Sequence, residues 1–187
     1  MDSGRAARTD ARRNRERVLA AASQLFAERG PDAPYIEIAK QAGVGVGTVY
    51  RHFPAREELI EAAYRSELDA ICDAAADLLK SLPPERALRA WMDRFMDYMS
   101  TKIGLSEAIG AVVAAGRNPY AHSRERLDGA LATLLDATAA AGLTRPDVDP
   151  DDVVMSLSGI AMAVSATQQP EQAARMVDLL YAGLSRR

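Results

Sequence analysis

The sequence predicts an all-α protein of about nine helices, with an N-terminal three-helix domain followed by a larger helical domain. Aromatic residues make up only 5% of the chain, and alanine is abundant. No stretch sustains the polar and apolar alternation that a strand requires. The 187 residues are enough to bury a core without disulfides, so a helical globular protein is expected.

The first helix is expected from about Ala11 to Arg29, where Gly30 and Pro31 end it. Its apolar residues share one helical face: Val18, Ala22, Leu25 and Phe26. Residues 1–10 lie outside this pattern and are expected to be disordered in isolation.

Two short helices should follow, at about 35–42 and 46–53, separated by a tight turn at Gly43. A long helix is expected from Arg56 to about Leu79. Five more helices are bounded by proline or glycine, near 84–101, 104–116, 120–141, 150–167 and 170–185.

Charge divides the chain into a basic head and an acidic body. Residues 1–56 hold 10 Lys and Arg against 6 Asp and Glu, whereas residues 57–187 hold 13 against 20. This division is typical of a DNA-binding head on a body that does not bind DNA, although a solvated charged tail would give part of it. We therefore expect domains at 1–56, with a basic arm at 1–15, and at 57–187.

Cysteine and hydropathy exclude several classes of protein. Cys72 is the single cysteine, which rules out an internal disulfide, and it falls at an apolar helical position where burial is expected. No Cys and His cluster has the spacing of zinc ligands, so neither a metal nor a cofactor is expected. The N-terminus is arginine-rich, and no run of about 18 apolar residues predicts a membrane span. These features indicate a soluble, cytoplasmic protein.

The stretch from Ile38 to Phe53 has the pattern of a helix-turn-helix, because its apolar residues can share one small core and Gly43 can adopt the left-handed turn. Its second helix leaves a short outward face that fits a major groove about 12 Å wide. The outward residues are Val46, Gly47, Thr48, Arg51 and His52.

This region resembles the TetR (tetracycline repressor-like) family of regulators. The matching segments are VLAAA at 18–22, LFAERG at 25–30, IA at 38–39, AGV at 42–44, GTVYRHF at 47–53 and REELI at 56–60. The resemblance implies a ligand-responsive regulator, most simply a repressor that a small molecule releases from a palindromic operator. Activation of transcription is the alternative, because the direction of regulation depends on where the operator lies relative to the promoter.

The resemblance also implies roles for single residues. Thr48 and Tyr50 match positions that contact DNA backbone or bases, and His52 matches a phosphate contact. Arg56 stands where the family commonly has a phosphate-binding lysine. Val46 departs from the family, which often places a polar base reader there, and a valine can only pack against a group such as a thymine methyl.

The base readers are therefore expected to be Arg51 and Gly47, the latter by letting the backbone approach the groove. Arg12 and Arg13 belong to an arm that can lie along phosphates or in the minor groove, with a solubilising tail as the alternative. The other arginines of the arm are Arg5, Arg8 and Arg15.

The body carries an aromatic and methionine stripe at helical spacing: Trp91, Phe95, Tyr98 and Met99. Further apolar residues come from segments that can pack around it: Ile109, Val113, Tyr120 and Met162. Core packing is one interpretation. The other, implied by the resemblance, is a pocket for an apolar or aromatic effector.

The last two helices have two apolar stripes, more than one interface requires. In TetR-like proteins this helix pair forms a four-helix bundle with its twofold mate, which implies a homodimer. The expected interface residues are Leu157, Ile160, Met176, Leu180, Gly183 and Leu184. Burial within one subunit is the alternative.

Two other function classes find less support. An enzyme would need catalytic groups, but His52 and His122 have no Cys or Ser nucleophile in a recognisable setting, and no phosphate-binding glycine loop occurs. A helical interaction module without DNA binding would have a neutral or acidic head, whereas this head is basic.

Overall fold

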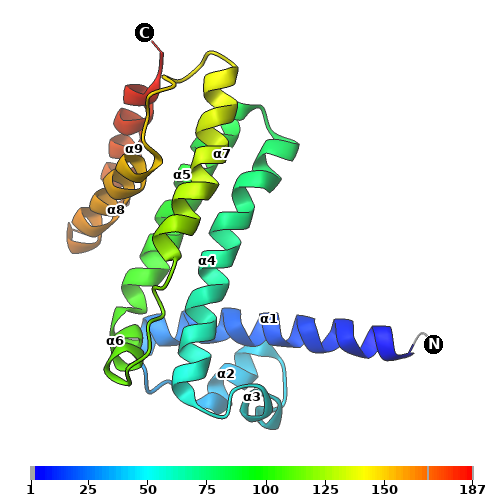
Figure 1. The fold of residues 1–187 in the computed structure, drawn as a ribbon. Helices are drawn as coiled ribbons and strands as arrows, with labels where there is room; N and C mark the ends of the chain where they lie inside the picture. Colours follow the sequence, from blue (N-terminus) through cyan, green and yellow to red (C-terminus); the bar gives the residue numbers. More distant parts are fainter. Residues whose placement is uncertain (1–2, 168, 187) are drawn as a thin grey trace. The chain divides into compact units, whose positions relative to one another are not determined.

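A computed structural model describes residues 3–167 and 169–186, with the side chains of residues 9–166 and 169–186. This part of the chain forms nine α-helices and no strand, which confirms the predicted all-α fold (Figure 1). The helices are α1 (Ser3–Arg29), α2 (Tyr35–Ala42), α3 (Val46–His52), α4 (Arg56–Ser81), α5 (Pro84–Gly104), α6 (Ser106–Ala114), α7 (Ser123–Ala140), α8 (Pro150–Thr167) and α9 (Pro170–Leu184).

Proline and glycine set most of the helix boundaries. α5, α8 and α9 begin at Pro84, Pro150 and Pro170, where a missing N–H is not needed by the helix. Gly30 and Gly142, which follow α1 and α7, have φ angles of 76° and 74° that other residues resist.

The start of α1 differs from the prediction. The helix begins at Ser3, not at about Ala11. Residues 3–10 have no apolar period, but they are rich in alanine and arginine, which are strong helix formers. Intrinsic propensity therefore continues the helix beyond the segment that packing requires.

The chain divides into two compact units. The first runs through Glu67 and includes Gly104–Pro119, so it holds α1, α2, α3, the first turns of α4, and α6. Within it, α2 packs against α1 and α3, and α6 packs against α1. Its largest fully buried side chains are Phe26, Ile38, Leu59, Ile60, Tyr64, Leu105 and Ile109.

Close contacts hold the segment 104–119 in this unit, beside the residues 1–56 of the expected head. A Cβ atom on Gly104 would lie 2.8 Å from the Cβ of Ala27, so a glycine is needed where this segment meets α1. Arg117 forms ion pairs of 3.6 Å with Glu58 and 3.0 Å with Glu61 on α4. The segment 104–119 is thus packed with the helix-turn-helix.

The second unit comprises Leu68–Ile103 and the chain from Tyr120 onward, with α7, α8 and α9. Here α8 packs against both α7 and α9. The largest fully buried side chains are Leu88, Trp91, Met92, Phe95 and Leu131. Cys72 is half-buried on α4, less than expected, and this burial raises the pKa of its thiol. None of the helices in the described segments has the length and apolar character needed to cross a bilayer.

Candidate nucleic-acid interface

The turn between α2 and α3 fixes the direction in which α3 leaves the core. Gly43 has φ 64° and ψ 39°, the left-handed conformation expected from the sequence. Its N–H donates to the Lys40 carbonyl at 3.2 Å, and the N–H of Val44 donates to the Ala39 carbonyl at 3.0 Å. This pair of bonds closes the C-terminus of α2 as a Schellman motif.

Arg17 on α1 reinforces this turn. Its Nε donates to the Ala42 carbonyl at 2.7 Å, its Nη2 also donates to that oxygen, and Nη2 donates to the Gly43 carbonyl at 2.7 Å. A cation at these carbonyls satisfies the unpaired end of α2 and the negative end of its dipole. This role of Arg17 could not be predicted from the sequence, because the contacts join residues 25 and 26 positions apart.

The exposed face of α3 agrees in part with the one expected from its spacing. Val49 is fully buried, and this points the opposite side of the helix outward. Val46 and Tyr50 are 38% and 56% exposed. Gly47 and Arg51 are also exposed, whereas the remaining residues of the expected face, Thr48 and His52, are half-buried.

Two glycines on this face have no packing role within the chain. A Cβ atom on Gly45 or Gly47 would meet no atom within 4 Å, and neither glycine has a positive φ. Gly47 lies in the first turn of α3, and its missing side chain brings no internal packing among the described residues. Its absent side chain instead leaves the backbone open to close approach by a partner.

One arginine of the arginine-rich part of α1 contacts the residue that ends α3. The Arg15 guanidinium lies 5.4 Å from the centre of the Phe53 ring, at the end of α3. Arg12 lies three positions before Arg15 and therefore on the same side of α1, where it pairs with Glu16 at 3.5 Å. Arg13 lies four positions before Arg17, on the side that faces the turn. The side chains of Arg5 and Arg8 lie outside the described residues.

Three exposed cations of the first unit are not neutralised by a protein partner. Arg13, Lys40 and Arg51 are exposed, and within the described part of the chain they have no hydrogen bond or ion pair. Such exposed cations attract phosphates and make binding sensitive to salt.

Arg56 makes its contacts within the protein. Its Nη1 donates to the Pro31 and Ala33 carbonyls at 2.8 and 2.6 Å, and its guanidinium lies 5.1 Å from the centre of the Tyr35 ring. Tyr35 is buried, donates its hydroxyl to the Phe53 carbonyl at 3.2 Å, and lies ring to ring with Tyr50 at 4.7 Å. Burial raises the pKa of the Tyr35 hydroxyl, an effect that Arg56 partly offsets. Arg56 was expected to face phosphate, and no role was expected for Tyr35, whose partners lie far from it in the chain.

The residues expected to bind an effector lie in different environments. The stripe on α5 is buried: Trp91, Phe95, Tyr98 and Met99 are at most 5% exposed. The Trp91 indole N–H donates to the Ile71 carbonyl at 2.9 Å, and the Phe95 ring lies 5.4 Å from Trp91 and 5.8 Å from Tyr98. These contacts support core packing for the stripe.

The other expected effector residues differ from one another in burial. Ile109 and Val113 belong to the first unit, where Ile109 is buried and Val113 is 47% exposed. Met162 is 65% exposed on α8, and Tyr120, 42% exposed, lies with its ring 5.5 Å from the Lys102 ammonium. The spacing of apolar residues in the sequence did not distinguish the exposed Val113, Tyr120 and Met162 from the buried stripe on α5.

The expected interface on α8 and α9 also divides by burial. Leu157, Ile160 and Leu184 are at most 7% exposed, because their side chains pack within the chain. Their burial fits the alternative expectation of packing within one subunit and leaves them little surface for a partner. Met176 and Leu180 are half-buried, and Gly183 is exposed.

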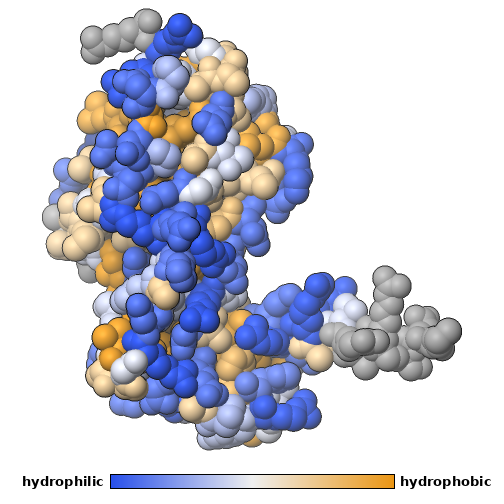
Figure 2. Space-filling view, in the orientation of Figure 1, coloured by the Kyte–Doolittle hydropathy of each residue, from blue (hydrophilic) through white to orange (hydrophobic). Residues whose placement is uncertain are grey.

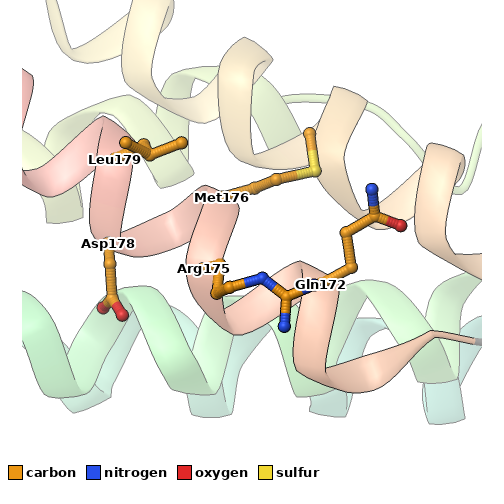
Figure 3. Close-up of a pocket in the computed structure, with 5 residues that line it drawn as sticks. All are labelled: Gln172, Arg175, Met176, Asp178 and Leu179. Carbon is orange, nitrogen blue, oxygen red and sulfur yellow. The ribbon is translucent and has the colours of Figure 1, made fainter.

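A different apolar set is exposed on this helix pair. Met155, Met162 and Leu179 are 52%, 65% and 74% exposed, and Figure 2 shows apolar surface over α8 and α9. An open hollow lies along α9, with walls from five side chains of that helix (Figure 3). They are Gln172, Arg175, Met176, Asp178 and Leu179.

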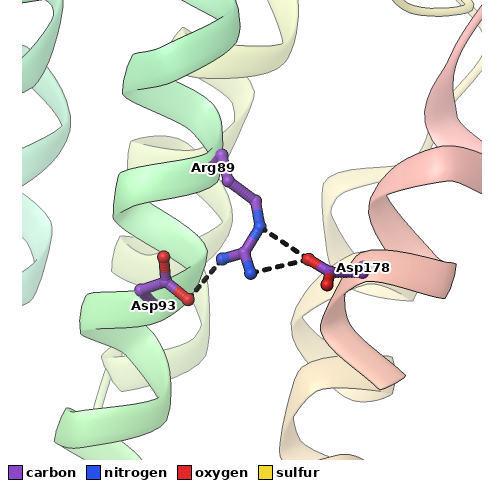
Figure 4. Close-up of polar contacts among 3 residues, drawn as sticks. All are labelled: Arg89, Asp93 and Asp178. Atoms are coloured by element: carbon purple, nitrogen blue, oxygen red, sulfur yellow. Dashed lines mark hydrogen bonds and ion pairs between the residues drawn. The ribbon is translucent and has the colours of Figure 1, made fainter. Parts of the chain in front are cut away.

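Polar contacts fix α9 against α5 in the second unit. Arg89 on α5 lies between two carboxylates and donates to Asp93 on its own helix and, at 2.8 Å, to Asp178 on α9 (Figure 4). The Tyr181 hydroxyl donates to the Glu85 carbonyl at 3.3 Å. These contacts hold the inner side of α9 and leave Leu179 outward.

Comparison with known proteins adds two family matches. Residues 18–63 match the model described as bacterial regulatory proteins, tetR family, and residues 83–186 match that of the transcriptional regulator SbtR-like C-terminal domain. A curated HTH-type transcriptional regulator of Staphylococcus aureus is 40% identical over 63 residues. That match spans 33% of this chain and only 34% of the relative.

Solved structures extend the similarity over nearly the whole chain. A TetR transcriptional regulator from Streptomyces coelicolor is 50% identical and has a TM-score of 0.88, covering 91% of this chain and 98% of that one. A TetR transcription regulatory protein from Mycobacterium vanbaalenii is 33% identical, with a TM-score of 0.79 and coverage of 96% and 99%.

Proposed function

This chain belongs to the TetR family of DNA-binding transcriptional regulators, and we propose that it is a repressor released from a near-palindromic operator by a small apolar molecule. The observation that carries the DNA-binding role is the exposed face of α3, with the unpaired Arg51 beside the open backbone of Gly47. A protein that acts on bacterial operators works in the cytoplasm.

In this proposal α3 enters the major groove. Arg51 reads base edges, Gly47 allows the backbone to approach, and Val46 packs against a base methyl group. Thr48, Tyr50 and His52 position the helix on the DNA backbone. Arg12 and Arg13 on the α1 arm add contacts to phosphates, which supply affinity but no sequence information.

Regulators of this family bind operator DNA as dimers. For this chain, the exposed residues of α8 and α9 are the proposed contact with a second copy. Met155, Met162 and Leu179 supply apolar area, and the hollow along α9 gives the partner helix a place to pack. Gly183, exposed on the same helix, permits close approach of a helix.

The effector is proposed to bind in the second unit, beside the Trp91 and Phe95 rings. Because these rings are packed, a ligand has to displace side chains, and adaptable neighbours such as Met92 and Met99 favour this. A ligand that prefers the conformation unable to bind DNA would lower operator affinity about 5- to 150-fold.

The DNA-binding role is tested by comparing Arg51→Ala with Arg13→Ala on operator and random duplexes. Arg51→Ala should cost about 1 to 3 kcal/mol on the operator and little on random DNA. Arg13→Ala should weaken both equally and lower the salt slope by about one unit per chain. Equal losses on both duplexes for Arg51→Ala would mean that Arg51 does not read bases.

The effector role is tested through Trp91, the only tryptophan. A small-molecule screen on its fluorescence should find an apolar ligand whose affinity falls when operator DNA is added, by the same factor by which it weakens DNA binding. A ligand that alters Trp91 fluorescence but binds equally with and without operator would contradict an inducer role.

A further inference from the structure

We propose that Arg56 and Tyr35 are positioning residues that hold the Tyr50 ring against the DNA backbone, and that Arg56 is not itself a phosphate contact. The proposal rests on the DNA-binding function proposed above. It concerns one cluster in the first unit, in which the loop before α2, the end of α3 and the start of α4 meet.

The guanidinium of Arg56 contacts groups of the protein itself. Its Nη1 bridges the Pro31 and Ala33 carbonyls at 2.8 and 2.6 Å, and its planar face lies 5.1 Å from the Tyr35 ring centre. The side chain is also half-buried. A guanidinium that bridges two carbonyls and stacks on a ring uses the geometry that distinguishes arginine from lysine.

Tyr35 links Arg56 to α3 through its contacts with Phe53 and Tyr50. Its side chain is 5% exposed, and its hydroxyl is bonded to the Phe53 carbonyl at 3.2 Å. Its ring lies 4.7 Å from the ring of Tyr50, which is 56% exposed. Tyr50 is thus an exposed side chain with a buried aromatic support. Such a support reduces the rotamer entropy that Tyr50 would otherwise lose on binding DNA.

The substitution Arg56→Lys separates the two roles. A lysine keeps the positive charge, so it would serve as a phosphate contact. It cannot stack as a plane on Tyr35 while bridging two carbonyls. A positioning role is therefore lost in Arg56→Lys, whereas a phosphate contact survives.

The experiment titrates the protein onto an operator duplex, obtained by selection from random DNA, at several salt concentrations. Arg56→Lys should lower affinity about ten-fold with the salt slope unchanged, because the lost interaction is an uncharged hydroxyl contact of Tyr50. Tyr35→Phe, which removes only the bond to Phe53, should cause a smaller loss. Neither change should weaken binding further in a Tyr50→Phe background. Arg65→Lys, an exposed change on the same helix, is the matched control.

Several results would overturn the proposal. Wild-type affinity in Arg56→Lys, or a salt slope lower by about one unit per chain in Arg56→Ala, would make Arg56 a phosphate contact. An equal loss in the Tyr50→Phe background would mean that Arg56 only maintains the fold. If Arg56→Lys does not fold, as seen in its thermal melt, Tyr35→Phe in both backgrounds decides the question.

A readout without DNA separates this proposal from the function on which it rests. In fluorotyrosine-labelled protein, the fluorine resonance of Tyr50 is identified by its loss in Tyr50→Phe. Arg56→Lys should move that resonance toward its unfolded value, and an unmoved resonance would contradict the positioning role. If the wild-type protein binds no operator, the proposed function fails while this measurement still tests the cluster.

Discussion

Two glycines of the helix-turn-helix differ in what they do, although the sequence shows them four positions apart. Gly43 is required by the protein itself, because its φ is 64° and an added Cβ would lie 2.6 Å from Nη2 of Arg17. Gly47 is helical and meets nothing. Gly43 is therefore needed for folding, whereas Gly47 is proposed to leave space for DNA.

This difference predicts opposite effects of alanine. Gly43→Ala should lower the free energy of unfolding by about 1 kcal/mol or more, because alanine is strained in the left-handed region. Gly47→Ala should leave stability unchanged or slightly raised, because nothing among the described residues occupies the place of the added Cβ in the first turn of α3, while operator binding weakens. Chemical denaturation and DNA titration of both variants check this. Full operator affinity in Gly47→Ala would contradict close approach of DNA at this position.

Asp128 on α7 is predicted to make stability depend on pH. Its Oδ1 is buried with no hydrogen-bond partner among the described residues, and burial, with the charge of Asp151, raises the pKa of its carboxyl. A raised folded pKa means that stability is full below the unfolded value, about 3.9, and falls as the pH rises through the folded value. Asp128→Asn should therefore raise the melting temperature near neutral pH.

The control for this prediction is Asp136→Asn, an exposed aspartate on the same helix. The gain from Asp128→Asn should shrink as the pH is lowered below about 3.9, where the wild-type carboxyl is neutral in both states. A gain that is equal at all pH values would point to a packing effect instead.

At the scale of residues, the sequence predicts what depends on neighbours in the chain. The Gly43 turn and the outward Val46, Gly47 and Arg51 follow from helical spacing and backbone preference. The inward position of Arg56 does not, because its carbonyl partners lie 23 and 25 positions away. The same applies to Arg17.

At the scale of elements, α9 has one side fixed and one side exposed. Leu184 is 5% exposed, and its carbonyl accepts the N–H of Arg145 at 3.0 Å, whereas Leu179 is 74% exposed. A charge at the two leucines should therefore have different consequences.

Leu179→Glu should yield a folded monomer, because it places a charge in the proposed contact between copies without entering the core. Leu184→Glu should lower stability by several kcal/mol, because an unpaired charge enters the interior. Sedimentation and thermal melts measure the two properties separately. A Leu179→Glu protein that remains dimeric would place the contact between copies elsewhere.

Helix boundaries were predictable because proline and glycine act locally, as at Pro84, Pro150 and Gly30. The face that each helix buries was harder to predict. Apolar spacing on α8 selects Leu157 and Ile160, but the apolar residues that remain exposed are Met155 and Met162. When a helix is apolar on several sides, only packing against its neighbours decides which side is left for a partner.

At the scale of the whole molecule, the basic head and acidic body predict strong salt dependence. Several arginines that displace counterions should make the logarithm of affinity fall linearly with the logarithm of salt, by about 0.9 for each phosphate contact. Titrations from low to physiological salt check this slope. A slope near zero would exclude the arm and α3 as a phosphate-binding surface.

The division of charge and the order of the helices were predictable from the sequence, because each depends on the composition and pattern of many residues and not on single contacts. The membership of segment 104–119 in the first unit was not, because it depends on the close fit of Gly104 to Ala27 and on the ion pairs of Arg117. Contacts between segments so far apart in the chain leave no periodic signal.

The most direct test of the DNA-binding role is selection from a pool of random duplexes by the purified protein. One reading face per chain covers a few base pairs, so a twofold dimer should enrich an inverted repeat. Its half-sites should be one helical turn or a multiple apart, roughly 34 to 36 Å per turn. Failure of folded dimer to enrich any inverted repeat would contradict the proposal that its paired α3 helices read an operator.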